Sequence, residues 1–386
     1  MKRRLRAGMV GGGRGAFIGA VHRMAMRLDD EIELVAGAFS SDPEKSRLSG
    51  EDLLLDPRRI YADFEAMAAA EAALPPEEQI DLVTIVTPNA THVPIAKAFL
   101  QAGFHVVCDK PLGVSLAEAV ELREIVRESG RIFALTHNYT GYVMVKEARE
   151  LVRHGNLGAL RKVVVEYPQG WMSKPLPNED AIDGSWRAIP KLNGPSGCLA
   201  DTGTHAEHLA RYITGLRIDA LCAEFTSFVP GRALEDDANL LIRYHGGAKG
   251  ILSASQVSLG EENALAIRIY GTEAALEWRQ EQPNELIVKH PDAPREILRP
   301  GNDYLSPAAR RFSRIPAGHP EGFIEAFGNI YREIVRAIDA QLNGDRIPAD
   351  CDFPTIDDGV DGMAFLECAL QSARADGVWT SLPPFN

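Results

Sequence analysis

Short apolar runs alternate with longer stretches of helical spacing over the first third of the chain. Runs of strand length occur at 5–10, 32–39, 81–87, 105–108 and 132–136. Helical spacing follows the first run at 16–28, and a Ser-x-x-Glu capping box opens another helix at 115–129. Strands that alternate with helices are typical of a parallel sheet covered on both faces. Residues 1–140 are therefore predicted to form a doubly wound α/β domain.

The pattern changes after a predicted helix at 143–154. Period-two runs then follow one another at 162–167, 220–229, 239–244, 250–257, 264–270 and 275–279. Successive strands joined by glycine turns indicate a large, open and mostly antiparallel sheet. Helices at 206–213, 322–342 and 357–375 are expected to cover one face and leave the other for a partner subunit. Residues 141–386 are thus predicted to form a second domain, of the α+β class.

Composition agrees with two folded domains and narrows the choice of partners. The chain has 386 residues, 45% of them hydrophobic, and single cores stop growing below that length. Its net charge of -13 disfavours nucleic acid and anionic membranes as partners. Five scattered cysteines without a C-x-x-C pair indicate neither a disulfide framework nor a zinc site, so we expect a cytoplasmic protein.

A glycine-rich turn follows the first predicted strand directly. Gly11, Gly13 and Ala16 match G-x-G-x-x-G/A, the turn that brings a dinucleotide pyrophosphate to a helix N-terminus. Gly11 permits the tight turn, Gly13 the close approach of backbone, and Ala16 the packing of helix on strand. The predicted contacts of the cofactor in this segment are Gly11, Gly13, Arg14, Ala16, Phe17 and Ile18.

The end of the second predicted strand bears on the choice between NAD and NADP. An acidic residue is expected there to bind the ribose 2'-hydroxyl of NAD, and Ser40 stands in its place. A 2'-phosphate would therefore not be repelled, and Lys45 or Arg47 could accept it. The cofactor is expected to be NAD, with NADP left possible.

The later strands end in residues that can carry chemistry. Ligands bind at the carboxyl ends of parallel strands, which predicts cofactor contacts from two short segments. These residues are Thr87, Pro88, Asn89 and His92, then Asp109 and Lys110. Lys110 beside a nicotinamide can hydrogen-bond a substrate hydroxyl and assist proton removal. A surface lysine in an ordinary turn is the alternative interpretation.

A second cluster of titratable residues lies in the middle of the chain. If the segment is helical from about residue 202, then Asp201, His205 and His208 recur at i, i+4 and i+7 and share one face. An aspartate in register with a histidine suits general base work. A zinc site of these three side chains is the other interpretation, although no H-E-x-x-H frame accompanies them, and no metal is expected.

Taken together and in this order, these motifs resemble those of the Gfo/Idh/MocA oxidoreductases. The resemblance extends over nearly the whole chain. It implies a Rossmann domain joined to an α+β domain whose open sheet forms a homodimer or homotetramer, and NAD(P)-dependent oxidation or reduction of sugar and cyclitol hydroxyls. It also implies that Lys110 is the lysine of the family's Glu-Lys-Pro element, and that Asp201 and His205 are its substrate-binding aspartate and catalytic histidine. Asp109 in place of glutamate, and His208 in place of a frequent aspartate, depart from the family pattern.

Further substrate contacts are expected from position alone. Trp171, Trp186 and Arg187 precede the Asp201 segment, where aromatic rings and a cation can meet a sugar. Asn138 and Tyr139 follow the last predicted strand of the first domain. Loop packing and solvated charge are the competing explanation for Trp171, Trp186 and Arg187.

Three functions are compatible with these features. The leading hypothesis is hydride transfer between a nicotinamide cofactor and a secondary hydroxyl or keto group of a sugar, cyclitol or sugar derivative, with His205 as acid or base and Lys110 and Asp201 orienting the hydroxyl. The resemblance also covers NAD-dependent glycosidases, which oxidise, eliminate, add water and reduce again without net turnover of NAD. A sensor that binds nucleotide or sugar without catalysis is the third possibility.

Overall fold

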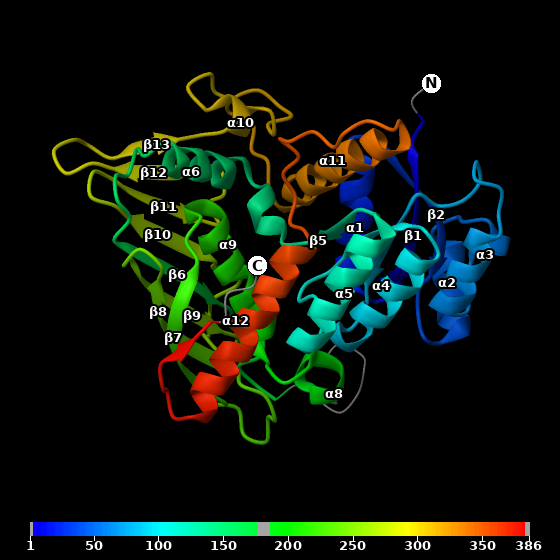
Figure 1. The fold of residues 1–386 in the computed structure, drawn as a ribbon, viewed down its shortest axis with the longest axis horizontal. Helices are drawn as coiled ribbons and strands as arrows, with labels where there is room; N and C mark the ends of the chain where they lie inside the picture. The colour runs from blue at the N-terminus through cyan, green and yellow to red at the C-terminus, as the bar shows by residue number, and fades with distance from the viewer. Residues whose placement is uncertain (1–2, 176–185, 383–386) are drawn as a thin grey trace. The chain divides into compact units, whose positions relative to one another are not determined.

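The computed structural model describes residues 3–175 and 186–382, and the chain forms two compact units (Figure 1). The first contains Met1–His137 and Phe327–Val360, and the second contains Asn138–Ala326 and Asp361–Asn386. The prediction assigned all residues after 140 to the second domain, whereas Phe327–Val360 belong to the first unit. The segment Phe327–Val360 joins the first unit, where Tyr331 packs against the buried His22.

A five-stranded parallel sheet forms the centre of the first unit and confirms the doubly wound class. Its strands are β1 (Leu5–Gly11), β2 (Ile32–Ala38), β3 (Leu82–Val86), β4 (His105–Cys108) and β5 (Phe133–Leu135). Their order is β2-β1-β3-β4-β5. Strands β3, β4 and β5 are buried throughout, as expected where helices cover both faces. The order reverses beside β1, so the carboxyl ends of β1 and β3 mark the topological switch point where such sheets bind ligands.

Helices flank this sheet on both faces. They are α1 (Phe17–Leu28), α2 (Pro43–Asp52), α3 (Phe64–Ala72), α4 (His92–Gln101), α5 (Leu116–Ser129) and α11 (Phe323–Leu342). Helices α3, α4 and α5 lie next to one another, whereas α11 packs against α1 (Figure 1). Half of the predicted capping box of α5 is present, since Ser115 Oγ accepts a hydrogen bond from Glu118 N at 3.3 Å, while Glu118 Oε2 accepts from Val114 N at 3.4 Å. Helices α2 and α3 were not predicted because they lack a clear apolar stripe.

The second unit is built on a nine-stranded sheet. Its strands are β6 (Lys162–Pro168), β7 (Ile218–Thr226), β8 (Asp237–Tyr244), β9 (Lys249–Ser255), β10 (Ala266–Tyr270), β11 (Ala275–Arg279), β12 (Leu286–Lys289), β13 (Glu296–Leu298) and β14 (Thr380–Ser381). The order is β13-β12-β11-β10-β6-β9-β8-β7-β14. All neighbouring pairs are antiparallel except β6 and β9, which run parallel. The predicted large and mostly antiparallel sheet is therefore confirmed.

One face of this sheet is covered by helices and the other is open. Helices α6 (Val143–Arg153) and α9 (Thr204–Thr214) pack on the sheet, as does α12 (Ile356–Arg374), where Ser372 Oγ accepts a hydrogen bond from Ala223 N of β7 at 2.9 Å. The short helices α8 (Pro190–Asn193) and α10 (Pro307–Arg310) lie in the connections. Along β8 buried and exposed residues alternate, and Leu241 on the open face is 51% exposed. Within residues 3–175 and 186–382, no helix combines the length and apolarity needed to span a membrane.

Candidate active site

The glycine turn connects β1 directly to α1, in a conformation that requires glycine. Gly11 and Gly12 have φ values of 80° and 71°, in the left-handed region that side chains disfavour. A Cβ on Gly11 would lie 2.6 Å from the carbonyl oxygen of Val86, and one on Gly13 would lie 2.8 Å from that of Phe39. Side chains at these positions would fill the turn, so it suits the close approach of a nucleotide pyrophosphate to backbone.

A glycine in α1 permits a close approach between this helix and the glycine turn. A Cβ on Gly19 would lie 2.4 Å from Gly12 Cα, whereas Ala16 precedes the helix and is half-buried. Gly19, in the first turn of α1, therefore lets the helix and the glycine turn approach closely, and the packing role of Ala16 stays a prediction. Phe17 is 74% exposed and Ile18 is half-buried in the first turn of α1.

Side chains from α1 and α2 hold the glycine turn in place. Arg14 pairs through Nε and Nη2 with the carboxylate of Asp52 at 2.5 and 2.7 Å, and its backbone N donates to Ser49 Oγ at 3.0 Å. Arg23 Nη1 donates to the carbonyl of Gly12 at 2.7 Å. Sequence reasoning named Arg14 but missed Arg23 and Ser49, since neither belongs to the motif.

The segment after β2 carries Ser40, which replaces the expected acidic residue. Ser40 Oγ accepts a hydrogen bond from Asp42 N at 3.1 Å, and Asp42 caps the N-terminus of α2. Arg47, named above as a partner for a 2'-phosphate, pairs with Glu44 at 2.6 Å and also with Glu51. Hydrogen bonds to both carboxylates raise its pKa above the usual value.

His92 joins the ends of β3 and β4. Its ring is 1% exposed, and its nitrogens contact two backbone carbonyls, Nδ1 that of Pro111 at 2.8 Å and Nε2 that of Thr87 at 2.9 Å. Burial lowers the pKa of His92, whereas the hydrogen bonds with the two carbonyls act to raise it. Thr87 and Pro88 are half-buried and Asn89 is buried at the start of the short helical turn η2 (Asn89–Thr91). The predicted cofactor segment at the end of β3 is thus built around a buried imidazole.

Asp109 and Lys110 follow β4 directly. Burial alone would raise the pKa of Asp109, but His22, Thr136 and His92 outweigh it and lower that pKa. His22 Nε2 lies 3.1 Å from Asp109 Oδ1, and Thr136 Oγ1 donates to the same oxygen. Lys110 is half-buried, and its peptide bond to Pro111 is cis. Asp109 is therefore an ionised side chain held from two sides, next to the lysine.

The Asp201 segment is not the regular helix that the sequence suggested. Leu199–Gly203 is π-helical (η5), and α9 begins only at Thr204. A π-helix has a longer hydrogen-bonded repeat, so the α-helical register of Asp201 with His205 was wrong, although His205 and His208 do share α9. The side chains of Thr202 and Thr204 each donate to the carbonyl four residues earlier, at 2.8 Å, and bonds of this kind disturb a helix.

Asp201 is held by two side chains that lie far from it in the sequence. Gln256 Nε2 donates to Asp201 Oδ2 at 2.7 Å, and Arg187 Nε lies 3.2 Å from the same oxygen. Gln256 is 2% exposed, and Arg187 stacks over the ring of Trp186, 4.5 Å from its centroid. The structure therefore brings together three predicted residues, Trp186, Arg187 and Asp201. It adds Gln256, which belongs to no motif.

Glu235 anchors the segment that leads into η5. Its Oε1 accepts hydrogen bonds from Ser196 Oγ at 2.6 Å, Gly197 N at 2.8 Å and Leu199 N at 3.2 Å. Burial raises the pKa of Glu235, while these hydrogen bonds act in the opposite direction. The position of Asp201 thus depends on a loop after β7 that sequence reasoning did not single out.

Aromatic side chains surround His205. Its ring is 8% exposed and meets the ring of Tyr139 edge to face, with centroids 4.7 Å apart. Tyr139 lies in the turn η3 (Asn138–Gly141) and bonds through its hydroxyl to Tyr167, which donates to Asn263 Oδ1 at 2.6 Å. Burial raises the pKa of both tyrosines, so these hydroxyls stay protonated at neutral pH.

The other predicted substrate residues have different surroundings. His208 is 2% exposed and lies against Tyr212, one helical turn further along α9. Asn138 is buried beside Tyr139 in η3. Trp171 is 44% exposed and donates through Nε1 to Gln169 Oε1 at 3.0 Å. In the described part of the chain, no group of three or more His, Cys, Asp or Glu side chains is arranged to hold a metal ion.

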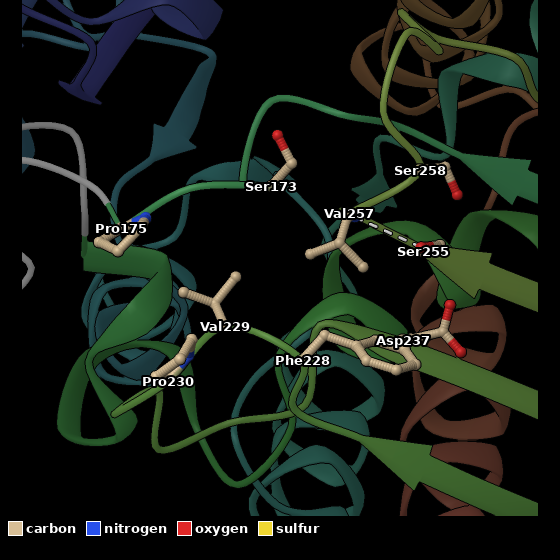
Figure 2. Close-up of a pocket in the computed structure, with 9 residues that line it drawn as sticks. All are labelled: Ser173, Pro175, Phe228, Val229, Pro230, Asp237, Ser255, Val257 and Ser258. Carbon is tan, nitrogen blue, oxygen red and sulfur yellow. Dashed lines mark hydrogen bonds between the residues drawn. The ribbon is translucent and has the colours of Figure 1, made fainter.

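A cavity of about 400 Å³ opens in the second unit, and Figure 2 shows the side chains that line it. They are Ser173, Pro175, Phe228, Val229, Pro230, Asp237, Ser255, Val257 and Ser258. None of the predicted site residues is among them. Ser255 and Val257 flank Gln256 in the chain, so the cavity borders the strand end that holds Asp201.

Comparison with known proteins agrees with this architecture. Residues 5–137 match the oxidoreductase family with an NAD-binding Rossmann fold, and residues 145–277 match the GFO/IDH/MocA C-terminal domain. The chain is 36% identical to the uncharacterized oxidoreductase YfiI of Bacillus subtilis, over 97% of this chain and 96% of that protein. The protein is therefore an NAD-binding oxidoreductase, and it belongs to the Gfo/Idh/MocA family.

Among the relatives are proteins whose names specify a ligand or a substrate. An inositol dehydrogenase homolog from Azotobacter vinelandii, solved with NADH and myo-inositol, is 40% identical with a TM-score of 0.92, covering 98% of each chain. Levoglucosan dehydrogenase of Pseudarthrobacter phenanthrenivorans is 26% identical over 99% of both proteins. The predicted family, fold class and NAD cofactor are confirmed by these matches.

Proposed function

We propose that the protein transfers a hydride between NAD and a secondary hydroxyl or keto group of a sugar, cyclitol or sugar derivative. The observation that carries this proposal is the Asp201 arrangement. A carboxylate held by Gln256 and Arg187 directly precedes the helix of His205, in a chain whose other unit has an NAD-type glycine turn. The relatives that act on or bind polyhydroxylated rings support the same substrate class.

NAD, when bound, accepts a hydride from the carbinol carbon, and NADH returns one in the opposite direction. We propose that the bound nucleotide contacts several segments, namely the Gly11 to Ile18 turn, Ser40, the Thr87 to Asn89 segment, and Asp109 with Lys110. His92 acts through the backbone of Thr87 and Pro111, because its ring nitrogens already face their carbonyls.

His205 is proposed as the general base of the oxidation. It takes the hydroxyl proton as the C–O bond gains double-bond character, and returns it during reduction. Asp201 accepts a hydrogen bond from a substrate hydroxyl, which its fixed carboxylate can do without reorganisation. Lys110 donates to the reacting oxygen and stabilises the negative charge that develops there.

The remaining predicted contacts recognise the ring of the substrate. Trp171 offers a partly exposed indole for stacking on the apolar face of a sugar. Arg187 binds hydroxyls from the same guanidinium that contacts Asp201. Four further residues stay predicted substrate contacts, namely Asn138, Tyr139, Trp186 and His208.

The test is a screen of purified protein with NAD and a panel of inositols, aldoses and anhydrosugars, read by NADH absorbance. Turnover on at least one is expected, and His205→Asn or Lys110→Ala should lower kcat by about 10²-fold or more while NAD still binds. His154→Asn, at the exposed end of α6, is the control. Release of aglycone from a chromogenic glycoside with substoichiometric NAD, and no net NADH, would instead establish the glycosidase. Tight NAD binding without turnover on any compound would favour a sensor.

We further propose that the open face of the nine-stranded sheet forms a homodimer or homotetramer. Cross-strand neighbours place an apolar row, Leu241, Ile251 and Val164, across β8, β9 and β6. Leu241 and Ile251 are 51% and 37% exposed, which is unusual for adjacent aliphatic side chains at the centre of a sheet. A second copy of the same face would bury this row.

A cytoplasmic location is proposed from the cysteines. Burial raises the thiol pKa of Cys108 and Cys198 well above its usual value. Such thiols are unreactive, and their number and spacing need no oxidising compartment. Fractionation of the host cells tests the location.

A further inference from the structure

Lys110 stands between two residues that are each held by a different buried histidine. Asp109, which precedes it, contacts His22 of α1, and Pro111, which follows it, contacts His92 of α4. Both rings are almost fully buried, at 0% and 1% exposure. Sequence reasoning missed His22 entirely and treated His92 only as a contact of the cofactor.

When the ring of His22 is neutral, its surroundings allow one arrangement of protons. Its Nε2 lies 3.1 Å from Asp109 Oδ1, a carboxylate oxygen that can only accept, so Nε2 carries the hydrogen. Its Nδ1 lies 2.6 Å from Tyr331 Oη, which in turn lies 3.2 Å from Thr84 Oγ1. With a neutral ring, Thr84 donates to Tyr331, Tyr331 to His22, and His22 to Asp109. This directed chain connects β3, α11 and α1 to the side chain before Lys110.

His92 acts on the backbone instead. Its Nδ1 is 2.8 Å from the carbonyl oxygen of Pro111, and its Nε2 is 2.9 Å from that of Thr87. Both partners are acceptors, so a neutral ring donates to only one of them at a time. The ring therefore ties the residue after Lys110 to the segment that ends β3.

We propose that His22 and His92 are positioning residues that hold Lys110 from its two sides, one through the side chain of Asp109 and the other through the backbone of Pro111. The proposal rests on the proposed function, in which Lys110 contacts the reacting oxygen. A lysine side chain is a flexible stem of four carbons, so its ammonium has a defined position only if the backbone of the residue is fixed. The two imidazoles provide this restraint from α1, which begins at the glycine turn, and from α4, which begins after the Thr87 segment.

Paired amide variants separate the two contacts of each ring. The amide of asparagine occupies about the position of Nδ1, and the longer amide of glutamine reaches about that of Nε2. His22→Gln therefore keeps a donor for Asp109 and loses Tyr331, whereas His22→Asn keeps Tyr331 and loses Asp109. For His92 the order is reversed, because Asn keeps the contact with Pro111 and Gln keeps that with Thr87.

The proposal predicts a crossed pattern of activities. His22→Asn and His92→Gln should each lower kcat about tenfold or more, with the KM for NAD changed less than about twofold. His22→Gln and His92→Asn should keep most of the activity. A role in stability alone would lower the melting temperature and activity of both variants at a position together, without this reversal, and that result would overturn the proposal.

Hydrogen exchange measured by mass spectrometry keeps the test independent of the substrate. In the apo protein, amides of residues 109–114 should exchange faster in His22→Asn and His92→Gln than in the wild type. The increase should be smaller in His22→Gln and His92→Asn. If the wild type turned over no polyol yet this pattern appeared, the proposed function would fail and the positioning would stand. Equal exchange in all four variants, with an active wild type, would overturn the positioning alone.

Discussion

The side-chain amide of Gln256 donates a hydrogen bond to Asp201 Oδ2 at 2.7 Å, which joins the end of β9 to the π-helical turn before α9. Gln256 is buried, and its removal takes away a hydrogen bond to a carboxylate that is itself mostly buried. Gln256→Leu should therefore lower kcat/KM for the polyol substrate by about 10- to 100-fold, since hydrogen bonds to charged groups contribute roughly 1.5–3 kcal/mol. Steady-state kinetics measure this effect. Gln371→Leu, an exposed glutamine of α12, should leave it unchanged, and equal rates in both variants would count against a role for Gln256.

The glycine turn should not tolerate a methyl group at residue 13. A Cβ there would lie 2.6 Å from Ser49 Oγ and 2.8 Å from the backbone oxygen of Phe39, and only the serine can move aside. Gly13→Ala should weaken NAD binding about tenfold or more, as measured by calorimetry. Gly362→Ala in α12, where a Cβ meets nothing within 4 Å, is the matched control. Unchanged NAD affinity in Gly13→Ala would show that the turn does not hold the nucleotide.

NAD should be preferred over NADP because Arg47 is already neutralised by two carboxylates. It pairs with Glu44 and Glu51 on the exposed surface of α2. The double variant with Glu44→Gln and Glu51→Gln frees the guanidinium of Arg47 for a 2'-phosphate. The kcat/KM for NAD divided by that for NADP should therefore fall about tenfold. The control is the double variant with Glu77→Gln and Glu78→Gln, which changes the net charge by the same amount at residues outside α2. A wild type that uses both cofactors equally would contradict this expectation.

The stability of the first unit should fall in mild acid because of His105. Its ring is 3% exposed in β4, its Nδ1 accepts a hydrogen bond from Ile132 N at 2.9 Å, and burial lowers its pKa to about 4. In the unfolded chain the pKa is near 6.5, so below that pH the unfolded state binds the extra proton and the free energy of unfolding decreases. The loss continues as the pH falls toward 4 and amounts to about 2 kcal/mol between pH 7 and pH 5.

Urea unfolding of His105→Asn at both pH values measures this contribution. Asparagine keeps an acceptor for Ile132 N but does not titrate, so the dependence on pH should shrink by that amount. The exposed His154→Asn should retain the full dependence. An equal slope for the wild type and His105→Asn would show that another group causes the acid sensitivity.

A charge on the open sheet face should dissociate the proposed oligomer. Ile251→Arg places a guanidinium in the apolar row between Leu241 and Val164, where a partner would have to desolvate it. Sedimentation should show monomers for this variant and a dimer or tetramer for the wild type. Leu259→Arg, at a leucine that is 81% exposed in a loop, should behave as the wild type does. A monomeric wild type would rule out the assembly.

Local patterns in the chain were enough for the sheet class and for most of the chemistry. Buried strand runs, the Gly11 turn and the position of Lys110 after β4 follow from side-chain periodicity and from glycine's freedom at positive φ, which are properties of neighbouring residues. The same patterns also indicated the mostly antiparallel second sheet. They identified Asp201 and His205 as a pair but assumed a regular α-helix between them.

Tertiary structure decided the contacts that connect distant parts of the chain. Gln256 meets Asp201 across 55 residues, and His22 meets Asp109 across 87, separations at which no periodicity carries information. The return of α11 to the first unit and the π-helical register before α9 likewise depend on which buried polar groups find partners. The sequence by itself thus determined which residues could carry out the chemistry, whereas packing alone decided what holds them in place, because a buried polar group is satisfied by whichever partner the fold brings to it.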